Sequence, residues 1–257
     1  DGACEMVARA IAAKSPLMDI SICGNGVGSE GAENLARAIG MAGETGNLQH
    51  LRLSANQRIT AAATCELARN LADSPLRSLE LAGTNVNPHA CSLFAASLPM
   101  SRLEVLDLAS NHFGCEGAWS LAWSLPDCPT LRTLNLADCA IGDDGGDEIA
   151  DALNRCAERS RSRKEAVALD KVDDIEPIVC GRNKADGIVG KVGQETPVGA
   201  AKLCDTEACG DIGNSEPKLF SLSLLDLRGN RLSPKHRLAL DPRVNMNFQH
   251  PVAARAQ

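Results

Sequence analysis

The side chains that could do chemistry in this chain of 257 residues are five histidines and eleven cysteines. A nucleophilic site would need a serine or cysteine beside a basic partner, and a zinc site would need cysteine or histidine pairs at short spacing. The histidines fall at unrelated places in the sequence, with no nucleophile arranged beside any of them. They are His50, His89, His112, His236 and His250. We therefore expect no catalytic residues and no enzyme activity.

The cysteines are interpreted as free thiols that act as small, buried apolar side chains. No C-x-x-C pair occurs, and Cys204 and Cys209, which lie near Cys180, form only a weak metal-binding pattern. We expect no bound metal and no cofactor. So many free thiols favour a reducing compartment, so the protein is predicted to be intracellular, either cytoplasmic or organellar.

Charge and hydropathy argue against two further classes of protein. The formal net charge of −7 and a pI near 5.3 disfavour a general nucleic-acid binder, which needs a basic surface. No apolar run approaches the roughly 18 residues of a membrane span, so no membrane insertion is expected. The segment 24–28 is rich in glycine but lacks the lysine of a phosphate-binding loop. It is interpreted as the turn after a strand.

The elements that must position these side chains are repeated units. Triplets of leucine or isoleucine with the spacing of a strand recur about every 28 residues. The first five triplets begin at Leu17, Leu48, Leu76, Leu103 and Leu131, and a sixth begins at Leu222 after a gap. Three residues after each triplet stand Asn25, Asn56, Thr84, Asn111, Cys139 and Asn230. Because an asparagine amide both donates and accepts, these positions predict a structural ladder, with weaker rungs at Thr84 and Cys139.

The second half of each unit has the spacing of a helix. In one unit Gly117, Ala118, Leu121, Ala122 and Leu125 follow the strand at this spacing. Five consecutive units match both halves, and over 3–156 they resemble the ribonuclease-inhibitor-like subfamily of leucine-rich repeats. The resemblance implies an α/β fold, a leucine-rich repeat solenoid with a parallel sheet on its concave side and helices on its convex side.

The same resemblance implies a function in binding. We expect a non-catalytic scaffold for protein–protein interaction, a subunit of a larger assembly whose partners are other protein subunits. The alternative is a GTPase-activating protein of the Ran type, since that family carries the same kind of repeat. The acidic C-terminal tail of that family is lacking here, and an analogy of fold alone is a poor warrant for activity.

The regular period ends after Cys156, and this sets the expected domain boundaries. We predict leucine-rich repeats over 1–156, as a partial N-terminal repeat plus five units, and an irregular insertion over 157–217. A degenerate repeat near 175–185 is left open. The last repeat and a closing strand are expected over 218–248, with a tail at 249–257. Because the chain begins inside a repeat, we expect a missing N-terminal segment or targeting peptide. Its N-terminal edge should then be covered by a missing repeat or by a partner.

One candidate surface for partner binding is a column of outward-facing strand positions. Arg52, Glu80, Asp107 and Asn135 hold the same position in successive strands, so they should lie side by side on the concave sheet. The neighbouring outward positions are mostly alanine, which would let a partner approach closely. The alternative is a solvated face that binds nothing.

The other candidate surface is the pair of tryptophans, Trp119 and Trp123, one helical turn apart. The same two helix positions hold mostly polar residues in the other units, and clustered tryptophan is typical of interface hot spots. Two interpretations stay open: a docking surface, or internal packing against Ala95 and Ala96 or beneath the insertion at 157–217.

Overall fold

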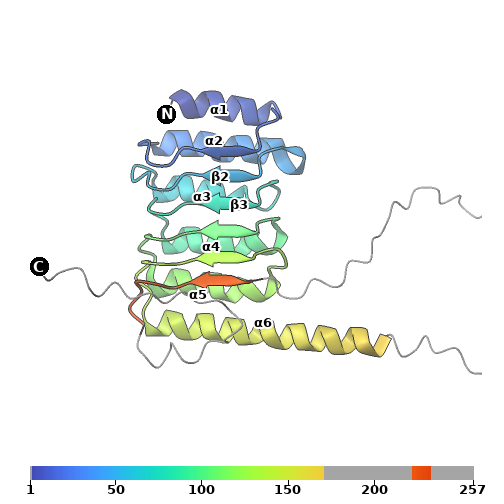
Figure 1. Ribbon diagram of the computed structural model, residues 1–257. Helices are drawn as coiled ribbons and strands as arrows, with labels where there is room; N and C mark the ends of the chain where they lie inside the picture. The colour runs from blue at the N-terminus through green and yellow to red at the C-terminus, as the bar shows by residue number, and fades with distance from the viewer. Residues whose placement is uncertain (1, 171–221, 233–257) are drawn as a thin grey trace, which may run out of the picture.

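The computed structural model describes residues 2–170 and 222–232, with the side chains of 2–162 and 222–232. Within these ranges strands alternate with helices along the chain (Figure 1). The helices are α1 (Gly2–Ala12), α2 (Ser29–Ala42), α3 (Ala61–Arg69), α4 (Pro88–Ser97), α5 (Gly114–Ser124) and α6 (Asp143–Asp170). Short 3-10 helices follow three of them: η1 (Gly43–Thr45), η2 (Leu98–Met100) and η3 (Leu125–Asp127). The strands are β1 (Asp19–Ser21), β2 (His50–Arg52), β3 (Ser78–Glu80), β4 (Val105–Asp107), β5 (Thr133–Asn135) and β6 (Leu224–Asp226).

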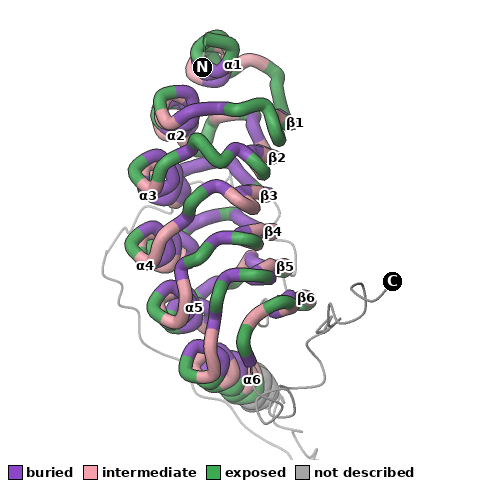
Figure 2. Tube along the Cα trace, turned by 90° about the vertical axis from the view of Figure 1, so that its left-hand side faces the viewer, coloured by how far each residue is buried: buried purple, intermediate pink, exposed green. Residues whose placement is uncertain are grey.

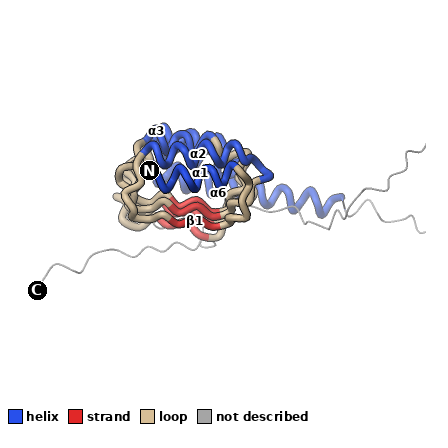
Figure 3. The backbone as a smooth tube through the Cα atoms, turned by 90° about the horizontal axis from the view of Figure 1, so that it is seen from above, coloured by secondary structure: helices blue, strands red, loops and turns tan. Residues whose placement is uncertain are grey.

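The six strands form one parallel sheet in chain order, from β1 to β6. Parallel neighbours need a crossover connection, which the helix of each repeat provides. Helices cover one face of the sheet and leave the other open, and the sheet lines the inner side of a gently curved stack (Figures 2 and 3). The register aligns the buried central residues Ile20, Leu51, Leu79, Leu106, Leu134 and Leu225. The predicted α/β solenoid with a parallel sheet is confirmed.

The core lies between the sheet and the helices, where aliphatic side chains of both layers meet. Leu79 and Leu106 from the strands and Leu35 and Leu121 from the helices have almost no exposed surface. Their burial provides most of the stabilisation, since each fully buried leucine contributes about 1.5–3 kcal/mol relative to exposure.

Helix α6 corrects the predicted boundary at residue 156. The structure continues α6 to Asp170, so 157–170 is helical and is not the start of an irregular insertion. The reason is local composition, because this stretch lacks glycine and proline and is rich in alanine, arginine and glutamate. Arg159 also fixes the extension by pairing with Asp127 and bonding the carbonyl of Pro126.

The pairing of β6 bears on the degenerate repeat predicted near 175–185. Strand β6 pairs directly with β5, with Leu134 opposite Leu225, so the sheet has no strand between them. Residues 171–221, the closing strand expected before 248 and the tail at 249–257 lie outside the described residues. In the part of the chain that is described, no helix is both long and apolar enough to cross a membrane.

Candidate protein-binding surfaces

The predicted ladder follows the strand ends, and three of its asparagines, Asn56, Asn111 and Asn230, each link two neighbouring repeats. Asn111 is buried, and its amide oxygen accepts the backbone N–H groups of Thr84 and Val86 from the preceding repeat, both at 3.0 Å. Its amide nitrogen donates to backbone carbonyls of both repeats, those of Leu81, Leu108 and Ala109. We call this arrangement an asparagine bracket.

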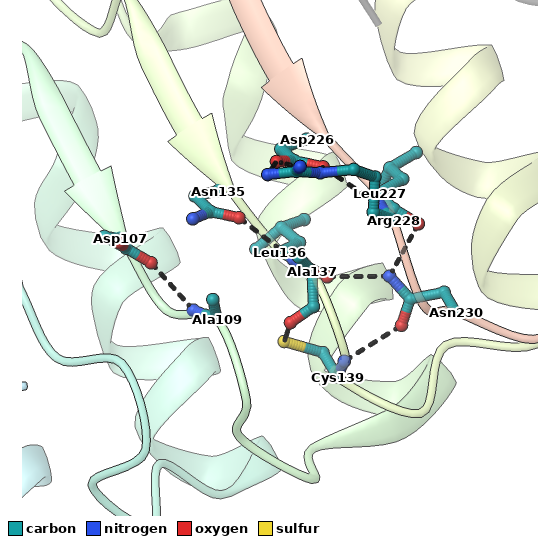
Figure 4. Close-up of polar contacts among 10 residues, drawn as sticks. All are labelled: Asp107, Ala109, Asn135, Leu136, Ala137, Cys139, Asp226, Leu227, Arg228 and Asn230. Carbon is teal, nitrogen blue, oxygen red and sulfur yellow. Dashed lines mark hydrogen bonds and ion pairs between the residues drawn. The ribbon is translucent and has the colours of Figure 1, made fainter. Parts of the chain in front are cut away.

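Two further asparagine brackets have the same geometry. Asn56 accepts the N–H groups of residues 25 and 27 and donates to one carbonyl in each repeat. Asn230 does the same with Cys139 (Figure 4) and with Ile141, at 3.0 Å each. The three brackets thus tie the repeats together in pairs.

Thr84 and Cys139 stand at the junctions between these pairs. The Thr84 hydroxyl donates to the carbonyl of Leu81 in its own repeat, at 2.6 Å. The Cys139 thiol lies 3.2 Å from the carbonyl of Leu108 in the preceding repeat. Asn25, in the first repeat, is exposed, and its side chain donates to the carbonyl of Cys23. The six predicted positions are therefore unequal rungs of one ladder.

The predicted concave column is assembled by the strand register. Ser21, Arg52, Glu80, Asp107, Asn135 and Asp226 are consecutive partners across the six strands. We call them the strand-end column. Arg52 pairs with Asp19 of the first strand at 2.7 Å, a contact that spacing within the column did not predict.

Three of the six residues of the strand-end column also bind the backbone through their side chains. The side chains of Asp107, Asn135 and Asp226 each accept the N–H group two residues on, at 2.9–3.1 Å (Figure 4). Each therefore fixes the chain where its strand ends, as an aspartate or asparagine does in a turn. Asp226 additionally pairs with Arg228 at 2.5 Å. Arg52 and Glu80 are the members of the predicted set without such a backbone bond among the described residues.

The fold alters the protonation of Glu80, a member of the strand-end column. Burial raises the pKa of Glu80 above its ordinary value of 4.5. The cation of Arg52 opposes this change, and the carboxylates of Asp107 and Asp19 reinforce it. A partner that brought a cation to this face would therefore relieve repulsion among carboxylates.

The opposite ends of the strands carry a row of charges that the sequence analysis missed. Glu104 binds Arg77 at 2.6 Å and lies 3.6 Å from Arg132, linking three successive repeats. The three residues occupy the same position before β3, β4 and β5, so their alternation in charge was visible in the repeat alignment.

The tryptophan pair lies on the convex side, on α5. Trp119 is 62% exposed and Trp123 is 75% exposed, which argues against internal packing against Ala95 and Ala96. The remaining alternative, a cover from 171–217, lies outside the described residues. The guanidinium of Arg155, on the neighbouring helix α6, lies 5.6 Å from the ring centroid of Trp123. Arg155 in turn pairs with Glu148 at 3.2 Å, and nothing in the spacing of the tryptophans predicted either contact.

Two observations on the described residues bear on metal binding and on catalysis by a thiol. They contain no group of three or more histidines, cysteines or acidic residues that could hold a metal ion. Burial raises the pKa of the Cys128, Cys139 and Cys156 thiols to about 12, so these are poor nucleophiles.

Comparison with known proteins agrees with the repeat architecture. The family model described as Leucine Rich repeat matches residues 101–122 and 127–150. Ran GTPase-activating protein 1 of Xenopus laevis is 33% identical over 88 residues, which are 34% of this chain and 14% of that protein. Tonsoku-like protein of Bos taurus is 37% identical over 87 residues, which are 32% of this chain and 6% of that protein. The match thus spans a small fraction of either relative.

A solved structure shows the same fold. The tropomodulin C-terminal domain of Caenorhabditis elegans superposes with a TM-score of 0.50 at 15% identity, covering 63% of this chain and 98% of that domain. At this identity the likeness concerns the fold alone.

Proposed function

We propose that this leucine-rich repeat protein is a non-catalytic protein-binding module, a scaffold subunit of a larger assembly, that docks a partner through Trp119 and Trp123. The observation that carries the proposal is the exposure of both rings on α5. Exposing a pair of large apolar rings to water is energetically unfavourable, and hot spots of protein interfaces are enriched in tryptophan.

The first repeat shows which residues occupy these two helix positions where the helix face contacts only solvent. The first repeat has Glu5 and Arg9 there, which form an ion pair at 2.6 Å one helical turn apart. Such a pair suits a helix face that meets only water. On α5, two exposed aromatic rings stand in place of this polar pair and add nothing to the buried core. The difference between the repeats therefore favours a role in binding.

The experiment restores the polar pair in the full chain. We expect Trp119→Glu with Trp123→Arg to abolish capture of the native partner while the melting temperature falls by no more than about 4 °C, the cost of losing the exposed contact between Arg155 and Trp123. The matched control is Met41→Glu with Met100→Arg, since both methionines are 75% exposed elsewhere. The control should retain the partner. Equal capture by the two double variants would reject the proposal.

The strand-end column is the other candidate interface, and the structure sharpens its test. Charge reversal at Asp107 would also break the hydrogen bond to the N–H of Ala109, so a loss of binding would be ambiguous. Glu80→Lys changes the same face without removing a backbone bond of the described residues. Lost binding in Glu80→Lys, with the tryptophan variant unaffected, would move the interface to the concave side.

A second candidate function follows from the similarity to Ran GTPase-activating protein 1. The chain could act on a small GTPase through its repeat surface, in which case it would accelerate GTP hydrolysis. A single-turnover assay with purified Ran and the full chain distinguishes the two functions, because a scaffold leaves the hydrolysis rate unchanged.

A further inference from the structure

The contact between Arg155 and Trp123 shows that an aromatic ring of this surface binds a cation. The guanidinium lies over the ring, 5.6 Å from its centroid, within the range of a cation–π interaction. Glu148 holds the same guanidinium at 3.2 Å. The ring of Trp123 is therefore already in contact with a cation, and that cation is paired with a carboxylate.

Trp119 lies one helical turn earlier on α5 and is also exposed. In the described part of the chain, no cation lies over its ring. The neighbouring α6 has Asp147 at the position equivalent to Trp119 and Asp151 at the position equivalent to Trp123. Helices α5 and α6 lie side by side in both views (Figures 1 and 2).

By repeat position, the neighbours of Trp119 are acidic on α6 and small on α4. On α6, Asp144, Asp147 and Asp151 follow one another at helical spacing, and all three are exposed. On α4, the equivalent positions are Ser92 and Ala96, which are also exposed and leave the ring accessible. Carboxylates beside an aromatic face increase its attraction for a cation, since both present negative potential.

We propose that Trp119, with the carboxylates of α6, is the receptor for a lysine or arginine in a basic segment of the partner protein. This inference rests on the proposed function and names the chemistry of the partner. The partner's cation would lie on Trp119 as Arg155 lies on Trp123, with the exposed carboxylates of Asp144 and Asp151 as its counter-charges. The negative net charge of the whole chain would also speed the approach of a basic segment.

The composition of the chain provides a direct optical test. Trp119 and Trp123 are its only two tryptophans and tyrosine is absent, so indole fluorescence reports on this surface alone. The probe is a peptide of alternating arginine and alanine, and the comparison peptide alternates glutamate and alanine. We expect the arginine peptide to change the emission saturably, with affinity that falls as salt increases, and the glutamate peptide to leave it unchanged.

Substitutions assign the binding to the proposed groups. Trp119→Ala keeps Trp123 as the reporter, removes the aromatic face without adding a charge, and should weaken binding of the arginine peptide by about thirtyfold, as at a hot spot. Asp144→Asn with Asp151→Asn should weaken it severalfold. The matched control, Glu30→Gln with Asp73→Asn, removes two exposed carboxylates of other repeats and should have no effect.

Each contrary outcome has a distinct meaning. No response to the arginine peptide, equal responses to both peptides, or equal effects of the two carboxylate variants would overturn the inference. Self-association in sedimentation that Trp119→Ala abolishes would overturn it in favour of a second copy of this chain. If Trp119→Glu with Trp123→Arg releases the native partner but Asp144→Asn with Asp151→Asn does not, only this inference fails. If the double tryptophan variant keeps its native partner, the proposed function fails.

Discussion

Replacing Asn111 with leucine tests whether the asparagine brackets hold the repeats together. Leucine has the same number of side-chain heavy atoms as asparagine, so the change removes hydrogen bonds without leaving a large cavity. Asn111 is 1% exposed, so water cannot replace the lost bonds. The cost then depends on how many backbone groups lose their last partner.

Only two of the five groups bound by Asn111 are orphaned by the change. The carbonyl of Leu81 keeps the Thr84 hydroxyl, and the carbonyl of Leu108 keeps the Cys139 thiol. The carbonyl of Ala109 keeps the N–H of Gly83 at 2.9 Å. The backbone N–H groups of Thr84 and Val86, which both bind the Asn111 oxygen, lose that acceptor. At about 1–3 kcal/mol for each buried, unsatisfied donor, Asn111→Leu should lower the free energy of unfolding by about 2–6 kcal/mol.

Asn25→Leu is the matched control, because the residue type and the repeat position are the same. Asn25 is exposed, and its side chain donates to one carbonyl, that of Cys23. The change should therefore cost less than about 1 kcal/mol. Thr84→Asn adds an amide where the ladder lacks one and should be neutral or stabilising.

Urea denaturation followed by circular dichroism measures all three variants, with the slope of the transition checking that each unfolds cooperatively. The reasoning is refuted if Asn111→Leu and Asn25→Leu change the free energy of unfolding by the same amount. It is also refuted if Asn111→Leu costs less than about 1 kcal/mol, the lower bound for one orphaned donor.

Three further predictions concern other parts of the fold. Because the pKa of Glu80 is raised in the folded state, that state binds the proton more tightly, and stability should fall as pH rises through the window above 4.5. Glu80→Gln should reduce this slope in urea midpoints measured from about pH 4 to pH 7. A Cβ on Gly117 would lie 2.6 Å from Cδ2 and 2.8 Å from Cβ of the buried Phe113, so Gly117→Ala should lower the melting temperature followed by circular dichroism. Burial raises the pKa of Cys139 to about 12, so maleimide at neutral pH should label Cys23 in the folded protein and Cys139 only after unfolding, as read by mass spectrometry.

The sequence predicted the sheet well because a strand has a period of two and the repeat has a nearly fixed length. Once leucines such as Leu51 and Leu79 are assigned to the core, the residues beside them must face outward. Arg52 and Glu80 therefore lie next to each other in the register, as predicted. Nothing beyond the position of the leucines was needed for this part of the fold.

The sequence predicted less well what each outward side chain does. Asp107 was treated as a free surface carboxylate, but it accepts the N–H of Ala109 at the end of its strand. That bond depends on the local turn, which a pattern of apolar residues does not describe. An aspartate or asparagine directly at a strand end was the available signal, because these side chains commonly bind the backbone two residues on.

The tryptophans and α6 illustrate two other limits of sequence patterns. Trp119 lies on the flank of a helix, where a small rotation decides between burial and exposure, so alignment of the repeats left both alternatives open. The end of α6 was misplaced because the repeat period marks the part of a helix that packs on the sheet. It does not mark where the helix itself ends, and α6 continues to Asp170 on its own helical propensity.

The junction between the repeats of β4 and β5 is crossed by side-chain contacts on both its strand side and its helix side. The junction at Cys139 lacks an asparagine bracket, yet it is crossed by the Cys139 thiol, which lies 3.2 Å from the carbonyl of Leu108. On the helical side it is crossed again by Arg155 over Trp123 and by Arg159 with Asp127. Helices α5 and α6 are thus joined to each other through side chains at a junction that lacks an asparagine bracket. A partner bound across Trp119 and the α6 carboxylates would span this same junction, so its binding should stabilise the pair of repeats on each side against separating.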